Sequence, residues 1–193
     1  MAAGLLSMPR GTYLHLDGGL EERFRCAPGA GGWRYVGERS DGVRTDLVAD
    51  TRWRQIRVEL AGPEWRIRGG VTGRDLVWVR GDAEHQARAV GFLGESPAFL
   101  VALSRTLDLR PGEGASVRVV QVTGPSLATL TVDRRWRLTG ITPYETETDP
   151  LPVAAYELTD LATGEVAPVH VAGDVVLNAP GIELTDLESP PNL

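Results

Sequence analysis

The sequence contains no lysine, one cysteine, three histidines and no long apolar run. Its 20 basic residues are therefore all arginine, and they are outnumbered by 26 acidic residues, so the formal net charge is −6. A protein that binds nucleic acid by neutralising phosphates needs clustered cationic side chains. We therefore expect no nucleic-acid partner.

The shortage of cysteine and histidine limits the metal chemistry that the chain can perform. Cys26 alone can form neither an internal disulfide nor a cysteine-built zinc site, and its neighbours Phe24 and Ala27 indicate a small buried thiol. The three histidines fall at unrelated spacings. We expect neither a metal nor another cofactor.

The longest apolar stretches fall short of the roughly 18 residues that a membrane span requires. The segment Met1–Met8 lacks the basic start and the apolar length of a signal peptide. With 193 residues, the chain fits one domain that buries about 70% of its unfolded surface. We expect a single-domain cytoplasmic protein covering residues 1–193, without a membrane span and with its oligomeric state left open.

Short segments that alternate apolar and polar residues dominate the chain. In Arg52–Leu60, for example, Ile56, Val58 and Leu60 recur at every second position and should share one face of a strand. Glycine, proline and aspartate separate such segments, which is typical of an antiparallel sheet built from hairpins. Comparable segments lie at 12–16, 20–26, 33–39, 43–50, 64–68, 74–80, 116–123, 127–133, 153–159, 166–172 and 175–178.

One segment has helical spacing instead. Ser96 precedes Pro97, a good first helical residue, and Phe99, Leu103 and Leu107 then recur on one side. We expect Ser96 to cap a helix over about residues 97–107 with its hydroxyl group. This helix should lie across the sheet. The acidic segment Tyr144–Asp149 reads as a solvated loop, with a lid as the alternative.

Two parts of the chain repeat each other. Leu47–Arg54 and Leu130–Arg137 carry Leu, Asp, Arg, Trp and Arg at matching places, and each follows a hairpin. Two copies indicate duplicated halves, since a solenoid needs three or more units. We therefore expect an internal pseudo-repeat at residues 33–60 and 116–140. The fold class should be all-β, mainly antiparallel, with one helix, and with duplicated hairpin sheets rolled into a half-open barrel.

Several motifs follow one another in a recognisable order. They are Asp50-Thr-Arg-Trp-Arg54, Gly69-Gly70 before Trp78, Ser96-Pro-Ala-Phe-Leu100, Pro125-Ser-Leu127, Tyr156-Glu-Leu158 and Asp174-Val-Val-Leu177. In this order the chain resembles a bacterial family of largely uncharacterised proteins that is named for glycolipid binding. The resemblance implies a half-barrel similar to lipoprotein carriers, with an internal cavity. The chain departs from the family pattern at Gly91–Phe99, so the resemblance does not imply a particular ligand.

A cavity of this kind would be lined by large residues that share a strand face with polar neighbours. Tryptophans and arginines together can hold a sugar or an acyl chain by stacking and bidentate hydrogen bonds. Equally, the tryptophans can be core residues that arginine stems cover, with Trp53 and Trp136 as packing anchors. The predicted ligand-binding residues are Trp53, Gln55, Arg57, Trp78, Arg80, Trp136, Tyr156 and His170.

Two functional hypotheses follow. The first is non-catalytic binding of a small hydrophobic or amphipathic molecule, lipid or glycolipid-like, in the half-barrel. The second is an enzyme, such as a cyclase, isomerase or hydrolase, acting on a hydrophobic metabolite in the same cavity; it predicts that His170, His15 or a nearby acid faces the cavity. Gly94-Glu-Ser96 lacks the final glycine of a nucleophile elbow. A third possibility is an interaction module that uses an exposed sheet edge.

Overall fold

The computed structural model describes residues 7–146 and 149–193. Residues 1–6, within the segment considered as a leader, and residues 147–148, within the expected loop or lid, lie outside the described residues. The described residues form one helix, α1 (Pro97–Leu107), and 15 strands. The strands are β1 (Arg10–His15), β2 (Leu20–Gly29), β3 (Gly32–Arg39), β4 (Arg44–Ala49), β5 (Gln55–Ala61), β6 (Arg66–Thr72), β7 (Asp75–Arg80), β8 (Ala83–Ala87), β9 (Phe92–Leu93), β10 (Gly114–Thr123), β11 (Ala128–Tyr144), β12 (Leu151–Asp160), β13 (Val166–Ala172), β14 (Val175–Ala179) and β15 (Ile182–Leu187).

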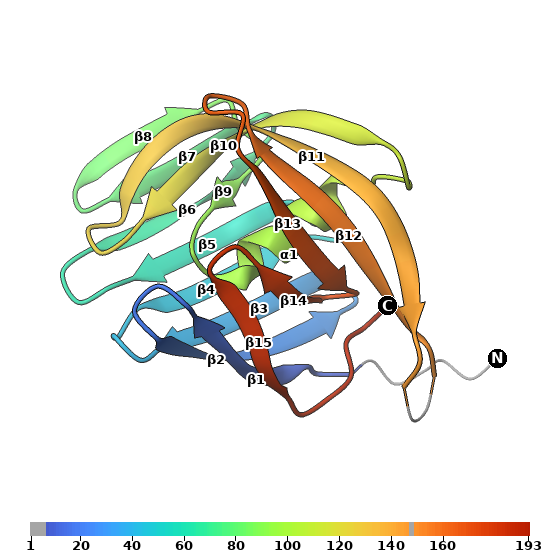
Figure 1. Cartoon of the computed structure of the whole chain (residues 1–193). Helices are drawn as coiled ribbons and strands as arrows, with labels where there is room; N and C mark the ends of the chain where they lie inside the picture. Colours follow the sequence, from blue (N-terminus) through green and yellow to red (C-terminus); the bar gives the residue numbers. More distant parts are fainter. Residues whose placement is uncertain (1–6, 147–148) are drawn as a thin grey trace.

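All of these described strands belong to one sheet, in the order β8-β7-β6-β5-β4-β3-β2-β1-β15-β14-β13-β12-β11-β10-β9 (Figure 1). The chain thus makes two meanders, β1–β8 and β9–β15, which are joined where β1 pairs antiparallel with β15. Within the described part of the chain, the short pair β9–β10 is parallel and the other pairs are antiparallel. Strands β8 and β9 are the two edges, so the sheet is rolled but open. The predicted all-β class with one helix is confirmed.

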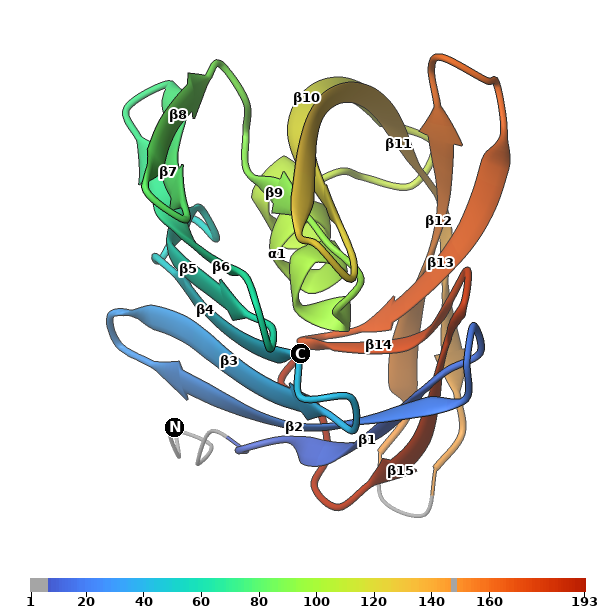
Figure 2. The ribbon, with the colours of Figure 1, turned by 90° about the vertical axis from the view of Figure 1, so that its left-hand side faces the viewer.

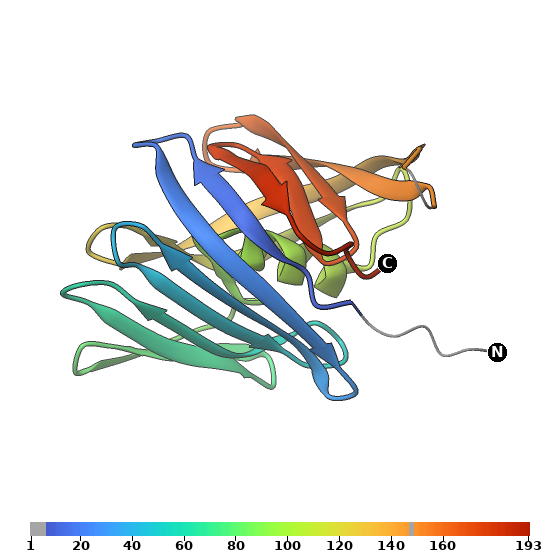
Figure 3. The same ribbon diagram turned by 90° about the horizontal axis from the view of Figure 1, so that it is seen from below.

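The helix lies inside the rolled sheet. Figure 2 shows α1 between the wing that carries β3–β8 and the wing that carries β10–β13. Seen from below, β1, β2 and β15 cross the floor under the helix (Figure 3). The helix residues from Pro97 to Ser104 are all buried, and α1 contacts β4, β9 and β14. The helix therefore fills much of the interior, and any ligand must bind beside it. No helix of the described residues is long and apolar enough to cross a bilayer.

The start of the helix differs from the prediction in one respect. Ser96 occupies the N-cap position and Pro97 follows it, as the spacing indicated. The Ser96 hydroxyl, however, makes no capping bond and instead donates to Oε1 of Glu22 at 2.6 Å. The predicted capping bond was wrong: the hydroxyl group points toward the buried carboxylate of Glu22, and its oxygen accepts no hydrogen bond from the helix amides. Ser96 thus connects the helix to β2.

Strand β5 shows how a bulge changes the face of a strand. The pairing of β4 with β5 shifts register between Val48 and Ala49. As a result Gln55 and Val58 point inward, and Ile56 is 45% exposed. The prediction that Ile56 shares a face with Val58 and Leu60 was wrong, because a bulge breaks the alternation that periodicity assumes.

The two tryptophans of the sequence repeat lie in different surroundings. Trp53 is half-buried in the turn between β4 and β5 and has a left-handed backbone with φ 62°. Trp136 lies within β11 and is fully buried. The hairpins that precede them, β3–β4 and β10–β11, are both antiparallel. The duplication of residues 33–60 and 116–140 stays a prediction.

Candidate ligand-binding pocket

A cavity of about 460 Å³ lies where the two meanders meet beside the start of α1. This volume is within the usual range for small-molecule sites. Its aliphatic wall includes Leu20, Leu93, Leu100, Val122, Leu158, Val169 and Ile182. Its polar lining includes His15, Asp17, Arg39, Glu95, Gln121, Arg134, Asp160 and Glu165. The cavity therefore combines an apolar wall with a few fixed polar groups.

The hairpin of β1 and β2 supplies a buried histidine and a buried glutamate. On β1 the inward phase contains Tyr13 and His15, and on β2 it contains Glu22 and Phe24. Nε2 of His15 lies 2.7 Å from Oε2 of Glu22, and these residues are 6% and 2% exposed. An ionised carboxylate can only accept, so the proton between them belongs to Nε2 of His15.

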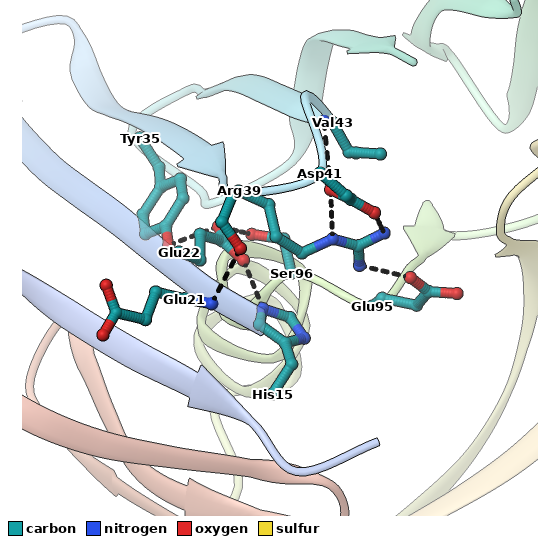
Figure 4. A network of polar contacts seen from close by, with 10 residues as sticks. His15, Glu21, Glu22, Tyr35, Arg39, Asp41, Val43, Glu95 and Ser96 are labelled. Carbon is teal, nitrogen blue, oxygen red and sulfur yellow. Dashed lines mark hydrogen bonds and ion pairs between the residues drawn. The ribbon is translucent and has the colours of Figure 1, made fainter. Parts of the chain in front are cut away.

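The other oxygen of the buried carboxylate is also engaged. The Tyr35 hydroxyl donates to Oε1 of Glu22 at 2.9 Å, and the Ser96 hydroxyl donates to the same atom (Figure 4). Burial, followed by the charge of Glu22, raises the pKa of Tyr35 well above its usual value, so the phenol stays a donor. Three donors from β1, β3 and the helix start therefore hold one carboxylate in place.

Two ion-paired arginines border the same cavity. Arg39 donates to both oxygens of Asp41, at 2.9 and 2.8 Å, and to Glu95 at 2.5 Å (Figure 4). Although burial raises the pKa of Glu95, the hydrogen bonds from Arg39 and from the Gly124 amide, together with the charge of Arg39, outweigh it, and the pKa lies below its ordinary value. Arg134 lies 2.8 Å from Asp160 and donates to Oε1 of Gln121 at 2.5 Å. Each guanidinium is therefore already neutralised by a carboxylate.

The polar lining carries more negative than positive charge. The two arginines face the carboxylates of Asp17, Glu95, Asp160 and Glu165, and Glu22 lies directly behind His15. An anionic group would therefore meet an unfavourable potential in this cavity. A neutral or cationic group would not.

The chemistry available in the pocket depends on Nδ1 of His15, the ring nitrogen that Glu22 does not contact. Among the described residues, Nδ1 of His15 has no hydrogen-bond partner, whereas Nε2 is held by Glu22. Nδ1 therefore presents a lone pair that can accept a hydrogen bond or a proton from a bound molecule. Ser96 donates to Glu22 and not to His15, so the described residues here form no serine–histidine pair. Among the described residues, no group of three or more His, Cys, Asp or Glu side chains is placed to hold a metal ion.

The eight predicted ligand-binding residues lie elsewhere: none is among the described residues that line this pocket. Gln55 is buried, and its amide exchanges hydrogen bonds with the backbone of Phe92 at 3.0 and 2.7 Å. Arg80 donates to the carbonyls of Ser126 and Leu127 and thereby ties β7 to the β10–β11 turn. These contacts hold the sheet edges.

The aromatic members of that set are packing residues in this structure. Trp78 stacks on His85, and Trp136 meets Tyr156 edge-on. Trp53 lies under the guanidinium of Arg105. The remaining two members, Arg57 and His170, are near the surface. Arg57 lies 3.6 Å from Asp46, and His170 forms a hydrogen bond with Asn178. Ligand contact by any of the eight stays a prediction.

The pocket residues carried a partial signal in the sequence. Glu22 has the same strand phase as Phe24 and Cys26, so an acid stands where an apolar residue is expected. His15 was one of three groups that the enzyme hypothesis expected to face the cavity, and it does. The contact of Glu22 with Ser96 joins residues 74 positions apart, which no local pattern reveals.

Comparison with known proteins bears on the fold. No family model matches the chain, and no curated protein matches its sequence. A crystal structure of a DUF1089 family protein from Pseudomonas aeruginosa aligns with a TM-score of 0.56 over 94% of this chain and 92% of that chain. The two sequences are 17% identical, so the likeness extends to the fold alone. The chain therefore has the fold of that DUF1089 family protein.

Proposed function

We propose that the chain binds an uncharged, hydroxyl-bearing amphipathic molecule, lipid or glycolipid-like, in the pocket at His15. The observation that supports this most is the buried imidazole that Glu22 holds in place, with its Nδ1 free in a cavity that also has an aliphatic wall. Such a site offers one oriented acceptor to a hydroxyl group and a dry surface to an alkyl chain. It does not require a reaction.

The aliphatic wall would supply most of the binding free energy. Burial of apolar surface contributes roughly 25 cal/mol per Å², and the half-buried side chains of Leu20, Leu93 and Leu158 offer such surface. Hydrogen bonds to His15 and Gln121 would then select the head group, because each net bond is worth about 0.5–1.5 kcal/mol. A head group without hydroxyls leaves these polar atoms unpaired and loses that contribution.

The charges of the lining favour an uncharged head. Arg39 and Arg134 are already paired with carboxylates, so neither can neutralise an incoming anion without breaking an existing ion pair. The remaining carboxylates repel a carboxylate or phosphate head. A sugar or polyol head avoids both costs.

Three ligands with one alkyl chain test this proposal: octyl glucoside, octanoate and octylammonium. We expect octyl glucoside to raise the melting temperature and to remain bound in native mass spectra, and octanoate to do neither at this site. His15→Gln should remove the effect of the glucoside. The matched control is His170→Gln, which changes a histidine outside the pocket and should leave the effect intact.

Two results would contradict the proposal. One is a rise in melting temperature with octanoate that the His15→Gln substitution removes. The other is a His15→Gln protein that is folded and still binds the glucoside as the unchanged protein does.

Catalysis is the second candidate function, and the same pair of residues favours it. A histidine whose second nitrogen is held by a carboxylate has the arrangement of a general base with its orienting group. In this role Nδ1 of His15 would accept a proton from the bound molecule, while Glu22 would stabilise the imidazolium through Nε2. The aliphatic wall would exclude water from the reacting atoms.

The fate of the bound molecule separates the two candidates. A ligand that co-purifies is identified by mass spectrometry, added back in excess and followed by NMR. Catalysis predicts chemical conversion that His15→Gln slows by about 10²–10⁴-fold, the usual contribution of a positioned base. Recovery of the molecule unchanged after prolonged incubation leaves binding as the function.

A further inference from the structure

A second cavity, of about 790 Å³, lies between the two meanders near the end of α1. It shares no lining residue with the pocket at His15. The N-terminal meander contributes Val71 and Arg74, and the C-terminal meander contributes Val117 and Leu161. Thr106 marks the helix end, where its hydroxyl contacts the Trp53 carbonyl at 2.7 Å. The cavity is therefore a separate site, with fixed walls on both sides of the open sheet.

The floor of this cavity is apolar. It is formed by Val71, Ala89, Val90, Val117 and Leu161. Ala89 is buried, and Val71, Val90 and Val117 are half-buried. Partly exposed aliphatic side chains that meet in a concavity gain free energy when an alkyl chain covers them.

The rim has the opposite charge to the protein as a whole. It carries four arginines and one aspartate, in a chain whose formal net charge is −6. Two of the arginines are paired: Arg54 with Asp50 at 2.6 Å, and Arg118 with Asp133 at 2.9 Å. Among the described residues, Arg74 and Arg88 have no ion-pair or hydrogen-bond partner. Two exposed guanidinium groups are therefore available at the edge of an apolar floor.

An alkyl chain with an anionic head group is complementary to both parts of this cavity: the chain to the apolar floor, and the head group to the arginines of the rim. A guanidinium binds a carboxylate or phosphate through two parallel hydrogen bonds, and it is more weakly hydrated than an ammonium group. The aspartate on the rim does not oppose such a head strongly, because Asp133 is already held by Arg118 through both carboxylate oxygens. The charge balance is the reverse of that in the pocket at His15.

We propose that this cavity binds a single-chain anionic amphiphile, taken from solution as a monomer, with its head at Arg74 and Arg88 and its chain over Val90 and Val117. The cavity volume suits one such molecule. A bilayer would instead need an exposed apolar face, whereas these side chains lie in a hollow between two walls.

Hexadecanoate, below its micelle concentration, is the probe, and isothermal titration calorimetry is the measurement. We expect saturable binding with one molecule per chain. Hexadecanol tests whether the charge matters, and inorganic phosphate tests the anion alone. Both should bind at least about tenfold more weakly than hexadecanoate, a difference of 1.4 kcal/mol.

The double variant Arg74→Gln with Arg88→Gln should weaken hexadecanoate binding about tenfold, since two charge-assisted contacts are lost. The matched control is Arg110→Gln with Arg135→Gln, two exposed arginines outside the cavity. Both double variants change side chains without partners, so both should unfold at the same urea concentration as the unchanged protein. Val117→Trp, which fills the cavity, should also reduce binding.

Four outcomes would overturn this proposal. They are equal binding of hexadecanol and hexadecanoate, equal binding of inorganic phosphate, unchanged affinity in the Arg74→Gln/Arg88→Gln protein, and binding to anionic vesicles without any binding of the monomer. The last result would replace the monomer with a membrane surface.

Discussion

Nε2 of His15 and Oε2 of Glu22 lie 2.7 Å apart on neighbouring strands, with His15 in the wall of the pocket and Glu22 behind it. The two residues are diagonal neighbours across the β1–β2 hairpin, where Tyr13 faces Glu22 in register. Because the carboxylate is buried, its three donors determine both the stability of this region and the orientation of the imidazole.

We expect Glu22→Gln to lower the free energy of unfolding by about 1–3 kcal/mol, the cost of leaving buried polar groups unpaired. The amide would bring its own N–H groups against donors such as Tyr35 and Ser96. Urea denaturation measures the change. Glu21→Gln, next to it on the exposed face of β2, is the control and should stay within about 0.5 kcal/mol. Equal stability of the two variants would mean that the carboxylate does not organise this region.

Gly37 makes room for the carboxylate. A Cβ atom at this position would lie 2.1 Å from Oε1 of Glu22 and 2.8 Å from the Tyr35 ring. Gly37→Ala should therefore cost about 1–3 kcal/mol, as overpacking in a core does. Gly140→Ala, also in a strand, meets nothing within 4 Å and should be neutral or slightly stabilising. Thermal unfolding of the two variants makes the comparison, and a Gly37→Ala protein as stable as the control would show that Glu22 can move away.

The ion pairs of Arg39 with Asp41 and Glu95 predict that the free energy of unfolding decreases in acid. The hydrogen bond from Arg39 lowers the pKa of Asp41, and it lowers the pKa of Glu95 against the opposing effect of burial. Since both pKa values are lower in the folded state, their stabilisation is complete above the ordinary values of 3.8 and 4.5 and is lost as the pH falls through the folded-state values.

Urea denaturation at neutral pH and at successively lower pH values below 4.5 measures this dependence. The Arg39→Gln protein should lose less stability over the same interval, because its two carboxylates return toward their ordinary pKa values. Parallel pH profiles for the two proteins would contradict this assignment. Both groups are partly exposed, so solvent screening limits the size of the difference.

Gln55 tests whether a predicted ligand-binding residue is structural. Its amide satisfies both backbone groups of Phe92 in the edge strand β9. Gln55→Met keeps the length of the side chain but leaves those two groups unpaired, so we expect a loss of about 1–3 kcal/mol. Gln86→Met, exposed on β8, is the matched control. If Gln55→Met left stability unchanged and abolished ligand binding, the original prediction would be correct.

The fold could be predicted further than the site, for reasons visible in particular residues. Pro97 and the spacing of Phe99 and Leu103 mark the helix, because its start and its period are local properties. Most strands were found through alternation. Strand β9 has two residues, and β8 contains no apolar residue larger than alanine, so neither produces a period that could be recognised.

The pocket depends on relations that alternation does not contain. Large aromatic residues drew attention to Trp78 and Trp136, which pack in the core. The buried polar residues His15 on β1 and Arg134 on β11 line one pocket because the two meanders join at β1 and β15. An acid in the inward phase of β2 was the one signal that could have located the site.

The pairing of β1 with β15 also has a consequence for biosynthesis. A nascent chain can complete the meander β1–β8 early, but the second partner of β1 lies at Ile182–Leu187 and leaves the ribosome after the other strands of the sheet. Until then one edge of β1 presents unpaired backbone groups that can recruit another chain. Translation that stalls before β15 should therefore yield fragments that aggregate through this edge.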